Sequence, residues 1–154
     1  AKTDALTLIN LAHHGVWNLD GRPSWDGHRL LVESDLYLPM DTEKIPLGET
    51  APVAGTAFDH RALAPIDPGL DHNFCFEPTG ERRRLARLVG PSGRALEVVS
   101  NAPGLQVYAG GVAGIALEPQ LWPDAPHHPA FPSILLQPGM EFSQVTLFRL
   151  FSPK

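Results

Sequence analysis

The sequence has little of what marks membrane, secreted or nucleic-acid-binding proteins. Its 154 residues include one cysteine, Cys75, so no internal disulfide can form and nothing points to an oxidising compartment. No run approaches the ~20 apolar residues of a membrane span, and residues 1–4 do not resemble a signal peptide. The net charge of −5 argues against a partner with a phosphate backbone. We therefore expect a cytoplasmic protein without nucleic-acid or membrane partners.

The sequence also lacks stretches free of proline and glycine that are long enough for a long helix. The chain has 16 prolines and 14 glycines, which recur every few residues and would break a helix. Between them lie short apolar or alternating runs, such as 28–34, 71–76, 85–89, 95–100 and 142–151. Many short strands separated by turn signals are typical of an all-β sandwich or barrel. We expect a single domain over residues 1–154.

One stretch does not fit a strand. Residues 122–132 contain four prolines at three-residue spacing, which excludes both a central strand and an α-helix. The pattern predicts an extended loop that crosses the surface or borders a site.

Histidine is comparatively frequent, with seven in the chain. Two adjacent pairs, His13-His14 and His127-His128, invite a metal interpretation. Neighbouring residues on a strand point to opposite faces, however, so neither pair is suited to chelate one ion. We expect no metal site.

Acid–base chemistry is better supported by the pattern. Glu118 lies at the end of the apolar run 115–117, directly before the proline-rich stretch. Burial there could tune its pKa for proton transfer; a strand-end glutamate that faces water is the alternative. His14 follows the apolar run 8–11 and precedes Gly15; a lone strand histidine is more often a packed core residue than a catalyst. The residues alone leave both as candidates.

Seven segments, in this order along the chain, give a stronger indication of function. Together they resemble the characteristic sequence motifs of the aldose 1-epimerase family. The segments are NLAHHGVWNL (10–19), DLYLPMD with IPLGE (35–41 and 45–49), PVAGTAFD (52–59), GLDHNF (69–74), GLQVY (104–108), LEPQLWPDA (117–125) and FPSILLQPG (131–139).

The resemblance implies a galactose-mutarotase-like β-sandwich, or supersandwich, of which this chain is the C-terminal half. It places His14 on the family's general acid and Glu118 on its general base, with Asp71 and Gln106 at positions that bind sugar hydroxyls. The implied activity is that of an isomerase, an aldose 1-epimerase that interconverts the α and β anomers of a free galactose- or glucose-like aldose. No cofactor is implied. The alternative is a carbohydrate-binding module of the same fold that lacks catalysis.

The chain departs from the family in length. It matches about half of the usual chain, and the missing N-terminal half supplies an arginine and a second histidine of the sugar site. Half a sandwich would expose sheet edges and an apolar inner face. We therefore expect a partner, either an N-terminal half chain or a second copy. A hexose-6-phosphate epimerase would need a phosphate site, for which Arg82–Arg84 is the candidate.

Overall fold

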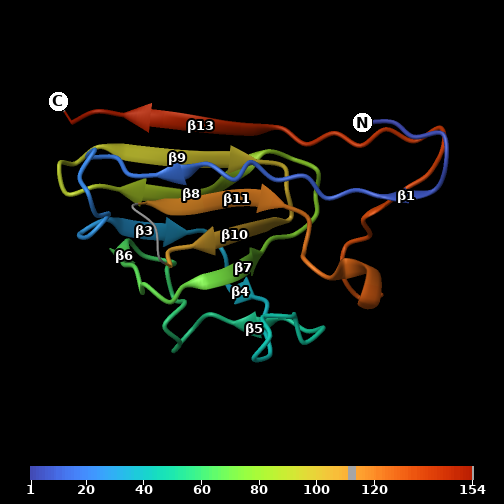
Figure 1. Cartoon of the computed structure of the whole chain (residues 1–154), viewed down its shortest axis with the longest axis horizontal. Helices are drawn as coiled ribbons and strands as arrows, with labels where there is room; N and C mark the ends of the chain where they lie inside the picture. Colours follow the sequence, from blue (N-terminus) through green and yellow to red (C-terminus); the bar gives the residue numbers. More distant parts are fainter. Residues whose placement is uncertain (111–113, 154) are drawn as a thin grey trace.

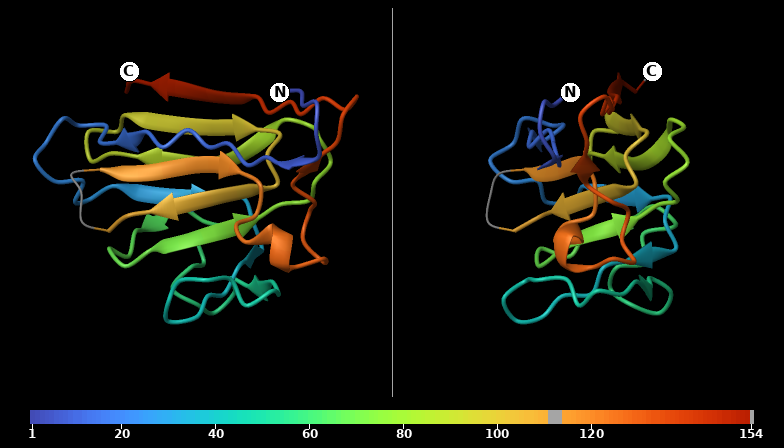
Figure 2. Two further views of the ribbon diagram at one scale, coloured as in Figure 1. Left: turned by 45° about the vertical axis from the view of Figure 1, so that its right-hand side comes forward. Right: turned by 90° about the vertical axis from the view of Figure 1, so that its right-hand side faces the viewer.

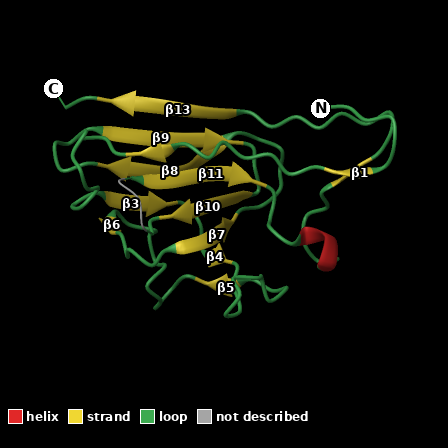
Figure 3. Ribbon diagram, in the orientation of Figure 1, coloured by secondary structure: helices red, strands yellow, loops and turns green. Residues whose placement is uncertain are grey.

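A computed structural model describes residues 1–110 and 114–153, and in that part of the chain the regular structure is β-strand and one 3₁₀ turn. The strands are β1 (Thr7–Leu8), β2 (Val16–Trp17), β3 (Arg29–Val32), β4 (Leu36–Tyr37), β5 (Ala51–Pro52), β6 (Ala64–Pro65), β7 (Asp71–Cys75), β8 (Arg83–Val89), β9 (Ala95–Ser100), β10 (Gly104–Tyr108), β11 (Ile115–Gln120), β12 (Leu135–Leu136) and β13 (Thr146–Phe151). The prediction of an all-β fold is confirmed (Figure 3).

Two large sheets and one small ribbon contain these strands. A six-stranded sheet has the order β2-β11-β10-β7-β4-β5, and a five-stranded sheet has the order β13-β9-β8-β3-β6. Among the described strands, β1 pairs with β12 alone, at one end of the molecule (Figure 1). All the strand pairs are antiparallel, which suits the short connections between them.

The two large sheets pack face to face, and the main core lies between them (Figure 2). Leu30, Leu88 and Leu96 from the five-stranded sheet meet Phe74 and Leu105 from the six-stranded sheet, and all five are fully buried. The expectation of an exposed apolar inner face is therefore wrong, since the chain forms both layers of a sandwich by itself. The expected exposed edges are present: β2 and β13 are the outer strands of their sheets.

Glu118 lies inside a strand, which corrects the prediction that it stands at the strand's end. β11 continues to Gln120 through Pro119, a residue that normally ends a central strand. β2 pairs with β11 only at Ile115 and Ala116, so Pro119 lies where this side of β11 has no neighbouring strand. Its carbonyl there accepts a hydrogen bond from Gln144 Nε2 at 2.9 Å.

The proline-rich stretch 122–132 is a loop, as predicted, with a single 3₁₀ turn at Ala125–His127. Ala125 and Phe131 of this loop pack with Leu38 and Cys75 in a second, smaller core. The loop therefore covers one end of the six-stranded sheet, on the face that turns away from the main core.

Candidate active site

The uncovered part of that outer face carries a row of polar side chains on three neighbouring strands. Gln106 of β10 lies directly opposite Glu118 of β11 and Asn73 of β7, so these three side chains share one face. Asp71 lies two residues before Asn73 and shares it as well. The residues between them on each strand, such as Leu117 and Leu105, point into the main core.

His14 reaches Glu118 from the segment before β2. Val16 pairs with Ala116, and continuing this register by two residues places His14 opposite Glu118. His14 Nε2 lies 3.2 Å from Glu118 Oε1. The two groups differ sharply in environment, because the His14 side chain is 67% exposed whereas that of Glu118 is 9% exposed. An exposed base and a buried carboxyl in direct contact can exchange a proton with each other or with a bound molecule.

Burial raises the pKa of the Glu118 carboxyl above its ordinary value. The nearby His14 and His13 act in the opposite direction, while the negative charge of Asp71 adds to the upward shift. A carboxyl whose pKa is raised towards neutrality is a better general base than an ordinary surface glutamate, because its protonated form is less strongly disfavoured.

A second polar group lies further along the same face. Gln106 Nε2 donates a hydrogen bond of 2.7 Å to Asp71 Oδ1, and Lys44 Nζ lies 2.5 Å from Asp71 Oδ2. The structure thus brings together all four residues selected from the sequence, as a His14–Glu118 pair beside a Gln106–Asp71 pair. Their roles in binding or catalysis stay predictions.

Two further residues at this polar row were not predicted from the sequence. Lys44 lies in the loop between β4 and β5, and nothing in the local pattern links it to Asp71. Asn73 is 1% exposed, and its Oδ1 has no hydrogen-bond partner among the described residues. Its signal was available, since two residues separate it from Asp71 on a strand and that spacing places both on one face.

Several other titratable or charged groups lie in structural environments away from the polar row. His28 is buried, where its Nε2 accepts a hydrogen bond from Leu19 N and its Nδ1 lies 2.6 Å from Trp25 O. Burial raises the pKa of Cys75 to about 12, so the thiol is inert. Arg84, a candidate phosphate ligand, instead pairs with Glu33 and Glu97.

The histidines outside the row do not build a metal centre. His127 Nδ1 and His128 Nε2 both contact the carboxylate of Asp124, at 2.5 and 3.0 Å. Within residues 1–110 and 114–153, no group of three or more His, Cys, Asp or Glu side chains could hold a metal ion. No helix in those residues is long and apolar enough to cross a membrane.

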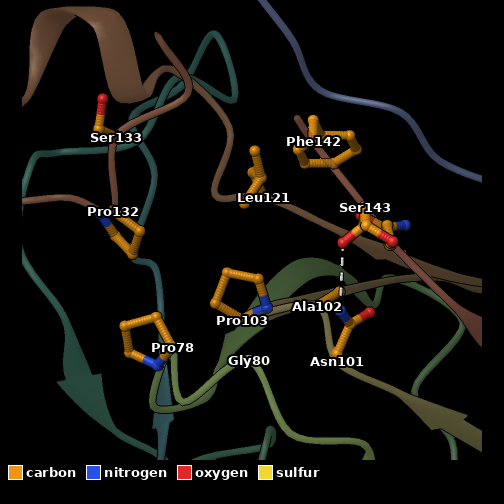
Figure 4. A pocket seen from close by; sticks show the side chains of 11 residues that line it. Pro78, Gly80, Asn101, Ala102, Pro103, Leu121, Pro132, Ser133, Phe142 and Ser143 are labelled. Carbon is orange, nitrogen blue, oxygen red and sulfur yellow. Dashed lines mark hydrogen bonds between the residues drawn. The ribbon is translucent and has the colours of Figure 1, made fainter. Parts of the chain in front are cut away.

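A hollow of about 390 Å³ lies elsewhere, beyond the ends of β9 and β11 (Figure 4). Its lining contains prolines, small polar residues and no titratable side chain: Pro78, Gly80, Asn101, Ala102, Pro103, Leu121, Pro132, Ser133, Phe142, Ser143 and Gln144. Proton transfer needs a titratable group, so this hollow cannot replace the polar row as the reactive site.

Solved structures define the class of fold. The chain superposes on an aldose epimerase homologue from C. elegans with a TM-score of 0.89 at 22% identity, over 99% of this chain and 54% of that one. A galactose 1-epimerase from Lactobacillus acidophilus gives a TM-score of 0.71 at 27% identity, over 97% and 51% of the two chains. The architecture is thus the galactose-mutarotase-like β-sandwich.

Sequence comparison then gives the family. A family model described as aldose 1-epimerase matches residues 1–149, and the chain belongs to this family. It is 38% identical to human galactose mutarotase over 97% of this chain and 52% of that protein. It is 32% identical to the aldose 1-epimerase of Escherichia coli, over 99% and 53% of the two chains. The chain spans about half the length of the curated relatives it matches.

Proposed function

We propose that this chain carries the acid–base centre of an aldose 1-epimerase that interconverts the α and β anomers of a free galactose- or glucose-like aldose. The contact of 3.2 Å between His14 Nε2 and Glu118 Oε1, on the same face as Gln106 and Asp71, is the observation that supports it most directly. Membership in the family, and the activities for which the human and E. coli relatives are named, agree with it.

The reaction would use the two groups in sequence. Glu118 takes the proton of the C1 hydroxyl, and the electron pair left on that oxygen forms the carbonyl. The bond between C1 and the ring oxygen breaks, and the ring oxygen takes a proton from His14. Rotation about the C1–C2 bond turns the other face of the carbonyl to the hydroxyl. Reclosure reverses both proton transfers, so no redox partner and no cofactor are needed.

The direct contact between His14 and Glu118 must open for a sugar to enter. The asymmetry of the pair suits this, because the exposed His14 side chain can swing away while Glu118 stays fixed on β11. Asp71 and Gln106 would then accept and donate hydrogen bonds to sugar hydroxyls and align the two proton transfers.

The completeness of the site is a separate part of the proposal. We infer that residues 1–154 form one domain that works with a partner, either a companion chain with the rest of the family fold or a second copy of this chain. Support comes from the open polar face and from the half-length match to the relatives. The free thiol agrees with a cytoplasmic location. Intact mass and light scattering of the purified protein would identify the partner.

Polarimetry of freshly dissolved α-galactose and α-glucose tests the activity. The protein should accelerate relaxation to the anomeric equilibrium, and Glu118→Gln or His14→Asn should each lower the rate by about 10²–10⁴-fold. Glu33→Gln is the matched control, because Glu33 pairs with Arg84 away from the row. Sugar binding without acceleration, and with no effect of Glu118→Gln, would instead indicate a carbohydrate-binding module.

A further inference from the structure

Lys44 is held at the polar row by a constrained turn. Met40 and Pro46 form a β-bridge, and Asp41 closes the turn by accepting hydrogen bonds from the backbone N–H groups of Glu43 and Ile45 at 2.8 and 3.0 Å. Inside this turn Lys44 has a φ of +65°, in the left-handed region that residues with a side chain seldom adopt. The backbone that carries the ammonium group is therefore fixed by its neighbours.

The contact of Lys44 with Asp71 differs from an ordinary surface ion pair. Lys2 and Glu141 show the ordinary kind, with a separation of 3.6 Å and two well-exposed side chains. Lys44 Nζ lies 2.5 Å from Asp71 Oδ2; the Lys44 side chain is 65% exposed, but that of Asp71 is only 22% exposed. The second oxygen of Asp71 already accepts from Gln106. Lys44 and Gln106 together orient the carboxylate from two sides.

We propose that Lys44 is a positioning residue of the sugar site, which orients Asp71 as a sugar-binding acceptor and shields Glu118 from the negative charge of Asp71. The inference rests on the proposed function only for the identity of the ligand. Lys44 belongs to a loop and not to the sheet, so it adjusts the site without contributing to the strands that build it.

The electrostatic part follows from the groups around Glu118. His14 contacts it and, together with the more distant His13, lowers its pKa, whereas the charge of Asp71 on β7 raises it. Lys44 faces Asp71, with Tyr108 of β10 close by. Removing the ammonium group would leave Asp71 uncompensated, so the pKa of Glu118 should rise further.

The test compares Lys44→Met with Lys44→Arg, and uses Lys2→Met as the control at an exposed ion pair. The first readout is the titration of the Glu118 side-chain carboxyl by carbon NMR without sugar, which needs no activity. Lys44→Met should shift the midpoint upwards, and Lys44→Arg should return it towards the wild-type value. The second readout is polarimetry, in which Lys44→Met should raise KM about tenfold, as expected for the loss of an acceptor oriented by a charged group.

The two proposals fail in different ways. If Glu118→Gln leaves the rate of anomer interconversion unchanged, the proposed function is wrong, yet the titration still decides whether Lys44 acts on Glu118. If Glu118→Gln abolishes activity while Lys44→Met keeps the wild-type KM and titration midpoint, the role of Lys44 is refuted. Lys44→Gly provides a second variant that the left-handed backbone accommodates, should Lys44→Met fold poorly.

Discussion

Replacing Leu117 by alanine tests the alternation of side chains that turns Glu118 towards the open face. Leu117 immediately precedes Glu118 on β11 and is fully buried in the main core, whereas Glu118 points the opposite way. The substitution removes most of a side chain from a close-packed site and leaves a cavity. Buried Leu→Ala changes cost about 2–5 kcal/mol in free energy of unfolding, and a fully buried strand position with neighbours from both sheets belongs near the middle of that range, about 3 kcal/mol.

That cost corresponds to a fall in Tm of about 6–12 °C for a domain of this size. Urea unfolding followed by tryptophan fluorescence should show a lower midpoint with an unchanged m-value, because the core is weakened and the exposed surface of the unfolded chain is the same. The matched control is Leu150→Ala on the edge strand β13, where Leu150 is 68% exposed. Its cost should stay within about 0.5 kcal/mol.

A second consequence links stability to the site. Leu117→Ala leaves the outward side chains of β11 and β10 in place, so the activity per folded molecule should stay close to that of the wild type at low temperature. Equal costs for Leu117→Ala and Leu150→Ala, or a cost below 1 kcal/mol for the former, would refute the assigned faces of β11. The outward direction of Glu118 would then lose its basis.

Three further measurements probe buried groups. Burial raises the pKa of Glu118, so the folded state disfavours the ionised carboxylate and the wild type should lose stability as pH rises from about 4 towards neutrality. Glu118→Gln has no such charge and should become more stable relative to the wild type over this range. Urea unfolding across pH measures the difference. Burial lowers the pKa of His60, so stability should be full above about pH 6.5 and fall as pH decreases below it. His60→Leu should reduce this loss, and an equal loss in the variant would contradict the burial of the ring. Cys75 is buried with a pKa of about 12, so a thiol reagent at pH 8 should label it only in denaturant; rapid labelling of the native protein would contradict its place in the second core.

Most of the fold could be predicted from the sequence, because the patterns that mark its strands and loops are local. Alternating runs between prolines and glycines predicted the strands at 71–76 and 95–100, which the structure places at Asp71–Cys75 and Ala95–Ser100. The proline spacing predicted the loop over 122–132. The strand end at Glu118 was misplaced, because the rule against proline in strands applies only where a neighbouring strand needs the missing N–H. Whether β2 reaches Pro119 depends on pairing between distant segments, which no local pattern shows.

The candidate site, too, could be predicted from the sequence only where the signal is local. Asp71 and Glu118 stood in recognisable segments, but their distance from Gln106 and His14 depends on the strand order β2-β11-β10-β7. Lys44 carries no local signal at all, since its approach to Asp71 requires both the turn closed by Asp41 and the neighbouring position of β4 and β7. A residue whose function comes from tertiary approach becomes visible only once the fold is known.

The inner faces of the two large sheets cover each other within this chain. They enclose a core with fully buried residues from both layers. Leu8, Leu11 and Val16, on either side of His14 in the sequence, are exposed apolar side chains. Glu118 is buried on β11, whereas the His14 side chain is 67% exposed, although its segment is held by hydrogen bonds between Asn10 and the Leu121 backbone. A partner chain that covered His14 would therefore change the surroundings of this exposed imidazole far more than those of the Glu118 carboxyl, which β11 already buries.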